Sequence, residues 1–105
     1  MHVTCYFSGY IVVVIIGFKH KGLKLYYEKG DSSKLPAKQV KKIRLILTRL
    51  DAASVPEQMN IPAYRFHSLS GRLKGHYSVR VTGNFRITFR FEGENATDIN
   101  FTDCH

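Results

Sequence analysis

The spacing of hydrophobic residues changes along the chain, from a helical repeat in the first half to strict alternation in the second. Residues 21–29 carry Tyr26 and Tyr27 at offsets of three and four from Leu23, which places all three on one face of a helix. Gly30 follows at the position where many helices end. The pattern therefore predicts a first helix over residues 21–29.

A second helical repeat follows a turn at residues 31–33 and has Pro36 in its first turn. We expect this helix to extend to about Ala52, with an apolar face made of Val40, Ile43, Leu45, Ile46, Leu47 and Leu50. Five basic residues occupy the remaining arc: Lys38, Lys41, Lys42, Arg44 and Arg49. From the pattern alone, these charges indicate a solvated helix face.

After Pro62 the repeat shortens to two residues, which is typical of strands. A short strand is expected at residues 64–67, and residues 75–81 alternate in a second. Gly83 and Asn84 then predict a hairpin turn. The residues expected to face inward on the strands from residue 75 onward are Tyr77, Val79, Val81, Phe85, Ile87, Phe89, Phe91, Ile99 and Phe101. The last two belong to a final strand over residues 96–102, which follows a turn at residues 93–95.

An unbroken, mostly β-branched apolar run occupies residues 10–16. It is too short to cross a bilayer, which takes about 20 residues, and no Lys or Arg precedes it as in a signal peptide. We expect a buried strand here, no membrane role, and residues 1–13 as an extension or a misassigned start of a single domain over residues 14–105. The fold class is then α+β, with an N-terminal strand, two helices and an antiparallel β-meander.

Composition adds an expected type of partner. Sixteen Lys and Arg against eight Asp and Glu leave a net charge of +8, which favours polyanions, nucleic acid above all. A chain of 105 residues can bury a core without disulfide or metal support. Cys5 and Cys104 are therefore interpreted as free thiols of a reducing compartment.

The basic residues gather in a stretch that contains no acid. Between Gln58 and Phe91 there is no Asp or Glu, whereas six basic residues occur: Arg65, Arg72, Lys74, Arg80, Arg86 and Arg90. Strand parity places the last three on the outward face of one hairpin. Such a face suits a phosphate backbone. The alternative is a solvated sheet face that protects an edge.

Catalytic groups are harder to find by pattern. The five histidines show no spacing typical of a zinc site, and we expect no metal or other cofactor. Metal-free RNA cleavage needs a base for the ribose 2′-OH, a cation for the phosphorane and an acid for the leaving 5′-oxygen. Those functions could be supplied by His67, Arg86, Asp103 and His105 if the sheet gathers them, although each also has a structural explanation.

Several segments match a known family. They are FKHKGL at residues 18–23, HSLSG at 67–71, GHYSVRV at 75–81, GNFRITFRF at 83–91 and DCH at 103–105. On these segments the chain, from Phe18 onward, resembles the HigB group of the RelE/ParE toxin superfamily. The resemblance covers about 88 of the 105 residues and agrees with the order of elements given above.

The resemblance implies a toxin of a type II toxin–antitoxin module, in the cytoplasm, that enters the ribosomal A site and cuts mRNA by the 2′-OH route. It implies a HigA-like antitoxin with a helix-turn-helix domain, and a toxin that is monomeric when free. Arg86 becomes the cation at the phosphate, and His67, Asp103 and His105 become the acid–base and positioning residues. The implied substrate contacts are Ser70, Arg72, Lys74, Arg80, Arg90 and Cys104.

Two positions depart from the family pattern. Ser70 stands where many relatives have lysine, and Cys104 where they have tyrosine before the final histidine. Serine stabilises an anion less well than lysine, and cysteine cannot stack on a base. A degenerate toxin that binds antitoxin and ribosome without cutting therefore remains an alternative. A ParE-like gyrase inhibitor is a further alternative, against which the set of His67, Arg86 and His105 argues.

Overall fold

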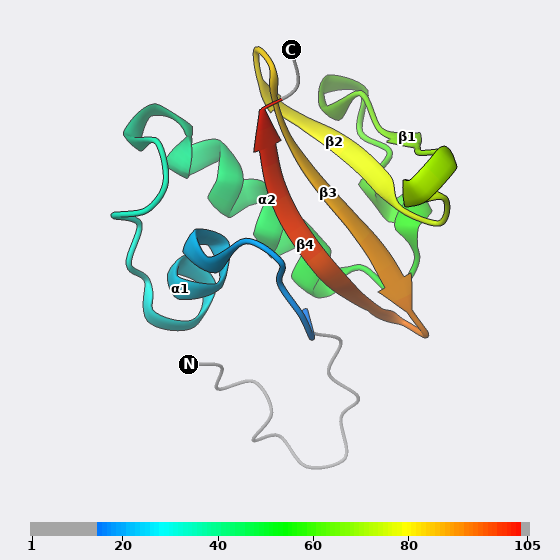
Figure 1. The fold of residues 1–105 in the computed structure, drawn as a ribbon, viewed down its shortest axis with the longest axis horizontal. Coiled ribbons are helices and arrows are strands. Elements are labelled where there is room, and N and C mark those ends of the chain that lie inside the picture. Colours follow the sequence, from blue (N-terminus) through cyan, green and yellow to red (C-terminus); the bar gives the residue numbers. More distant parts are fainter. Residues whose placement is uncertain (1–14, 104–105) are drawn as a thin grey trace.

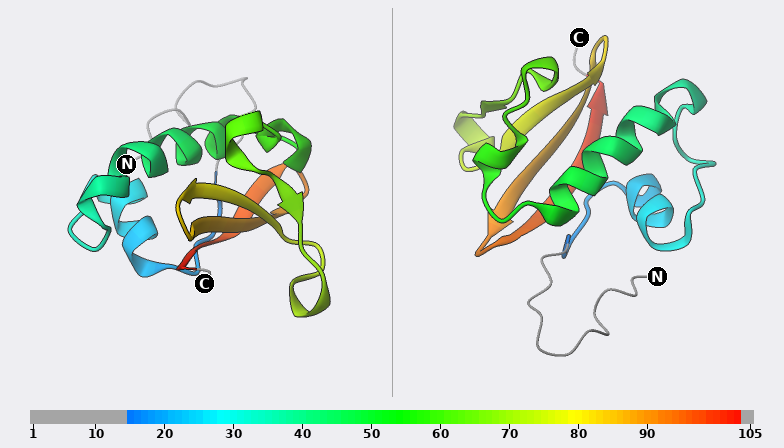
Figure 2. Two further views of the ribbon diagram at one scale, coloured as in Figure 1. Left: turned by 90° about the horizontal axis from the view of Figure 1, so that it is seen from above. Right: turned by 180° about the vertical axis from the view of Figure 1, so that it is seen from behind.

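A four-stranded antiparallel sheet, in the order β1-β2-β3-β4, forms the centre of the molecule, and a long helix crosses one of its faces (Figures 1 and 2). The structure is a computed structural model that describes residues 15–103. The elements are α1 (Lys21–Lys29), α2 (Val40–Ala52), β1 (His67–Ser68), β2 (Tyr77–Thr82), β3 (Phe85–Glu92) and β4 (Asn95–Asp103). The α+β fold class and the antiparallel meander are confirmed.

Helix α1 has the bounds that the sequence predicts. Gly30 ends it in the left-handed conformation, with φ of 72°, and donates its N–H to the carbonyl of Tyr26. The other end carries a cap that the pattern does not predict, since Nδ1 of His20 accepts the N–H of Leu23 at 3.1 Å. Burial lowers the pKa of His20 because it disfavours the charged imidazolium.

Helix α2 begins later than predicted, because residues Ala37–Gln39 form a 3-10 turn before it. Its buried face consists of Ile43, Ile46, Leu47 and Leu50. The prediction that Leu45 joins this face is wrong, since its side chain is 48% exposed. Leu45 lies two residues from both Ile43 and Leu47, which is more than half a turn away around the helix.

The core lies between α2 and the sheet face that turns toward it (Figure 2). Strand parity predicts this face correctly, because Val79, Ile87 and Phe89 are completely buried. The ring of Tyr77 stacks on Phe89 at a centroid distance of 6.0 Å and on Phe66 at 5.4 Å. Burying a side chain of this size contributes about 1.5–3 kcal/mol to stability.

The predicted N-terminal strand falls mostly outside the described residues. In residues 15–20 the chain lies along β4, where the N–H of Ile16 donates to the carbonyl of Ala96 and Phe18 forms a single parallel bridge with Ile99. The described part of the run thus pairs with the sheet but forms no strand. No helix within residues 15–103 has the length and apolar character needed to span a membrane.

The prediction of a strand over residues 64–67 is wrong in its bounds. Pro62 starts a 3-10 turn, Pro62–Tyr64, and Arg65 then adopts a left-handed conformation with φ of 49°. A left-handed residue breaks an extended segment, so the strand consists of His67 and Ser68 alone. Its two residues pair with Ser78 and Tyr77 of β2.

Strand β4 contains an irregularity that alternation alone does not reveal. Thr88 of β3 pairs with Asn100, but Arg90 pairs with Thr97, so that β4 has one residue more than β3 over this interval. The surplus falls at Asp98, which has φ of 53°. This is a β-bulge, which places two successive residues on the same side of the sheet. As a result Asp98 lies next to Arg90.

Candidate active site

Two rows of cross-strand neighbours cover the sheet face that turns away from α2. Paired residues in adjacent strands point to the same side. One row consists of Arg80, Arg86 and Thr102 on β2, β3 and β4. The other runs over all four strands as His67, Ser78, Thr88 and Asn100. The first row is cationic and the second is neutral.

A pocket of about 300 Å³ opens on this face. Its lining residues are Lys19, His67, Leu69, Leu73, His76, Ser78, Arg86, Thr88, Asp98, Asn100 and Thr102. The pocket thus brings together His67 and Arg86, two of the four residues expected to act in catalysis. Of the remaining nine lining residues, five are small and polar, and Leu69 and Leu73 add apolar surface, a combination that is typical of ligand pockets.

The imidazole of His67 is held in a defined state. Its Nδ1 lies 3.0 Å from the carbonyl oxygen of Arg65, and a carbonyl can only accept a hydrogen bond. Nδ1 therefore carries the proton in the neutral ring, which leaves the lone pair on Nε2. The His67 side chain is exposed. Such a ring can take a proton from a bound substrate.

Each guanidinium group of the cationic row has one buried nitrogen that lacks a partner among residues 15–103. Nε of Arg80 and one terminal nitrogen of Arg86 are buried and make no hydrogen bond within the described part of the chain. The two arginines are direct neighbours across β2 and β3. Most buried polar groups in proteins are paired, so these nitrogens mark a place where an anionic ligand would supply the missing acceptors.

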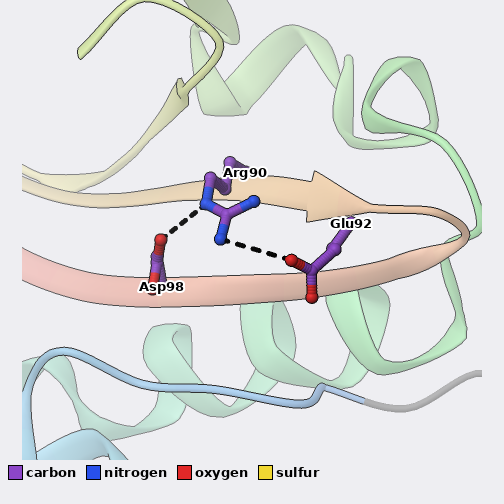
Figure 3. Close-up of polar contacts among 3 residues, drawn as sticks. All are labelled: Arg90, Glu92 and Asp98. Carbon is purple, nitrogen blue, oxygen red and sulfur yellow. Dashed lines mark hydrogen bonds and ion pairs between the residues drawn. The ribbon is translucent and has the colours of Figure 1, made fainter.

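Arg90 differs from its two neighbours, although strand parity puts it on the same face. Its guanidinium donates to the carboxylate of Asp98 at 2.6 Å and lies 3.7 Å from that of Glu92 (Figure 3). The hydrogen bond from Arg90 holds the pKa of Asp98 below its usual range, and the same contact raises the pKa of Arg90. The expected substrate contact at Arg90 is thus occupied by carboxylates of the protein itself.

The other expected site residues lie outside this pocket. Asp103 pairs with Phe85 and so shares the opposite side of the sheet with that residue. The implied contacts Ser70, Arg72 and Lys74 are exposed on the connector between β1 and β2. Cys104 and His105 lie outside the described residues. Among residues 15–103, no cluster of three His, Cys, Asp or Glu side chains could hold a metal ion.

Comparison with known proteins identifies the relatives of this chain. A family model described as the RelE-like toxin of the type II toxin–antitoxin system HigB matches residues 16–105. The chain belongs to this HigB family. It is 41% identical over 92 residues to "Endoribonuclease HigB" of Proteus vulgaris, which covers 88% of this chain and all of that protein. "Toxin HigB-1" of Vibrio cholerae is 36% identical over 76 residues, 70% of this chain and 80% of that protein.

Solved structures of other toxins share the fold of this HigB-family chain. The structure of YafQ from Escherichia coli superposes with a TM-score of 0.59 at 15% identity, covering 86% of this chain and 92% of that one. A YoeB dimer from Staphylococcus aureus gives a TM-score of 0.55 at 21% identity, covering 88% and 97%. At these identities the likeness concerns the fold alone. As a type II toxin, the HigB-family chain has an antitoxin as partner.

Sequence reasoning missed several pocket residues of this HigB-family chain. His76 and Ser78 belong to the segment that carries the family resemblance, but neither was expected at the site. Strand parity could have found Ser78, since it shares its side of β2 with Arg80. Asp98 had no such signal, because it reaches the pocket only through the bulge in β4.

Proposed function

We propose that this HigB-family chain cleaves mRNA on the ribosome, by attack of a ribose 2′-OH on the adjacent phosphorus, without a metal ion. The chain is an endoribonuclease toxin, as its Proteus vulgaris relative is named. The observation that carries the mechanism is the pocket itself, which holds His67 together with a guanidinium nitrogen of Arg86 that has no partner among the described residues. These are a cation and a base in one site.

His67 acts as the base in this mechanism. Its Nε2 removes the 2′-OH proton, and the 2′-oxygen attacks the phosphorus while the bond to the 5′-oxygen breaks. The products are a 2′,3′-cyclic phosphate and a free 5′-OH, so that the proton taken from one oxygen is matched by a proton given to the other. A positioned base contributes about 10²–10⁴-fold to such a step.

Arg86 stabilises the phosphorane by donating hydrogen bonds to its non-bridging oxygens, and Arg80 adds charge from the neighbouring strand. On the family resemblance, we assign Asp103, the last residue of β4, and His105 to protonation of the leaving oxygen and to positioning. Ser70, Arg72, Lys74 and Cys104 contact the RNA around the cut. Arg90 serves the site indirectly, by fixing Asp98.

The partners follow from the same proposal. The net charge of +8 favours binding to ribosomal RNA as well as to mRNA. We propose a cytoplasmic toxin that is monomeric when free and is inhibited by a HigA-like antitoxin with a helix-turn-helix domain. We also propose that residues 1–13 are an extension of the toxin domain, since the family match begins at residue 16.

The test is induced expression in bacteria, with transcripts mapped by primer extension. The natural chain should arrest growth and produce cuts within translated regions, and Arg86→Ala should lose both. Arg49→Ala is the matched control, because Arg49 is an exposed arginine of α2, the helix that covers the opposite face of the sheet. Growth arrest without cuts would contradict the endonuclease mechanism and would favour gyrase inhibition or blocking of the ribosome.

Ser70 and Cys104 provide a second test. If the natural chain fails to cut but the double variant Ser70→Lys, Cys104→Tyr cuts mRNA, the natural chain is a degenerate toxin and the proposed activity is wrong. If the natural chain cuts, the double variant should only change its rate.

A further inference from the structure

Two side chains with buried polar atoms line the pocket but have no part in the mechanism above. Both ring nitrogens of His76 and the hydroxyl of Ser78 are buried and make no hydrogen bond within the described part of the chain. Ser78 is only 1% exposed. Both residues line the same pocket as Arg86. The two side chains thus form an unpaired polar group inside a concave site.

This arrangement is costly without a ligand. A buried polar group that lacks a partner destabilises a protein by about 1–3 kcal/mol. The other two histidine rings of the described residues are engaged, since Nδ1 of His20 caps α1 and Nδ1 of His67 contacts the carbonyl of Arg65. At His76 neither nitrogen has a partner within residues 15–103. The missing partners are expected in a bound molecule.

The charges around the two residues indicate which part of an RNA would fit. Ser78 lies two residues before Arg80 on β2, which is about 6.6 Å along the strand, and belongs to the neutral row of the pocket. His76 lies within electrostatic reach of Asp98, whose carboxylate is paired with Arg90 and also lies near Lys19, a further residue of the pocket. A second phosphate placed beside His76 would be repelled by the carboxylate of Asp98, because both carry negative charge. A neutral ligand would not be repelled.

We propose that His76 and Ser78 bind the base of a nucleotide next to the cleaved phosphate and select that base by its hydrogen-bonding edge. The neutral imidazole has one donor and one acceptor, and the serine hydroxyl can do both. Leu69 and Leu73 supply apolar surface in the same pocket for the face of the base. The inference rests on the proposed function, since it places the phosphate of the same RNA at Arg86.

The direct experiment measures cleavage on purified ribosomes loaded with four mRNAs, which differ only in the base next to the cut. The natural chain should prefer one base. In Ser78→Ala and His76→Ala the ratio between the best and the worst base should fall about tenfold, which is the size of one lost base contact. His76→Gln, which keeps a donor and an acceptor, should retain part of the selectivity. Thermal melting of each variant shows whether it folds.

The matched control is Thr82→Ala. Thr82 carries an exposed hydroxyl on the same strand and lies outside the pocket, where it donates to Gln39. It should leave the ratio unchanged. If His76→Gln and Ser78→Ala slow cleavage of all four mRNAs equally, the two residues have a structural role and the proposal is overturned.

A binding measurement separates this inference from the endonuclease activity. The four nucleoside 5′-monophosphates and inorganic phosphate are titrated into the purified chain while the ring signals of His76 are followed by NMR. Shifts that depend on the base, and that change in Ser78→Ala, support the base site even if the natural chain cuts no mRNA. Equal shifts with all four nucleotides and with phosphate alone would overturn it.

Discussion

The two faces of the sheet are built from alternate residues of the same strands, yet they differ in almost every physical respect. On the face toward α2, Ile87 and Phe89 are fully buried among apolar neighbours. On the opposite face, Arg86 and Ser78 hold buried polar atoms that have no partner in the part of the chain that the structure describes. The comparison shows how the chain separates stability from function. The inner face stabilises the fold, whereas the unpaired polar atoms of the outer face lower the stability and form a site for a ligand.

The largest effect is expected on the inner face. Phe89→Ala removes a completely buried ring that contacts Tyr77 and Phe91, and the cavity left behind should lower the free energy of unfolding by about 3–5 kcal/mol. Chemical denaturation measures this loss. Phe91→Ala is the control, since its ring is only half-buried, and it should cost clearly less. Equal losses in both variants would mean that burial does not govern stability on this face.

Arg86→Ala should show the opposite behaviour. Removing a donor aimed at a developing charge should slow RNA cleavage by about 10²–10³-fold. The melting temperature should not fall, because one buried nitrogen of the lost group has no partner among the residues that the structure describes. The measurement combines a cleavage assay with a thermal melt. A loss of stability comparable to that of Phe89→Ala would contradict the separation of the two faces.

His20→Ala tests the start of α1, where the ring also contacts Phe101 of β4, and should have a moderate effect. It removes the side-chain cap of α1, which should cost about 1 kcal/mol. Because burial lowers the pKa of His20 in the folded state, its contribution is complete above the unfolded value of 6.5 and is lost as the pH falls toward the lower folded value. Below about pH 6.5, the melting temperature should therefore fall less steeply with decreasing pH in His20→Ala than in the natural chain.

The smallest effect is expected from Asp98→Asn, at the paired end of the outer face. The contact with Arg90 lowers the pKa of Asp98, so its stabilisation is present above the unfolded value of 3.8 and is lost as the pH falls through the lower folded value. The natural chain should therefore lose more stability in acid than Asp98→Asn does. Thermal melts from about pH 2 to pH 6 follow both carboxylate states. If the melting temperatures of the two chains depend on pH in the same way, the ion pair between Asp98 and Arg90 is not the cause of the acid sensitivity.

The sequence predicts those parts of the molecule that depend on neighbouring residues. The bounds of α1 follow from Leu23, Tyr26, Tyr27 and Gly30, and the two faces of the hairpin follow from alternation. What it misses depends on contacts between distant segments. The left-handed turn at Arg65 displaced β1 from its predicted residues, and the pairing of Asp98 with Arg90 needs the register of β4.

The candidate site divides in the same way. His67 and Arg86 were expected from their residue types and from the family resemblance, and both line the pocket. Arg90 was expected to contact substrate by parity alone, but parity does not report a carboxylate that arrives from the next strand. The absence of acidic residues between Gln58 and Phe91 therefore led to an overestimate of the free positive charge on this face.

The surplus residue at Asp98 brings a carboxylate to the outer face without changing the pairing of the rest of β4. Before the bulge Thr97 is level with Arg90, and after it Asn100 is level with Thr88. Because β4 is one residue longer than β3 over this interval, deletion of Asp98 would restore regular pairing, with Phe101 still level with Ile87 and Thr102 still level with Arg86. The fold should therefore tolerate the loss of this one residue, and Arg90 would then lose its nearest carboxylate partner and add positive charge to the outer face.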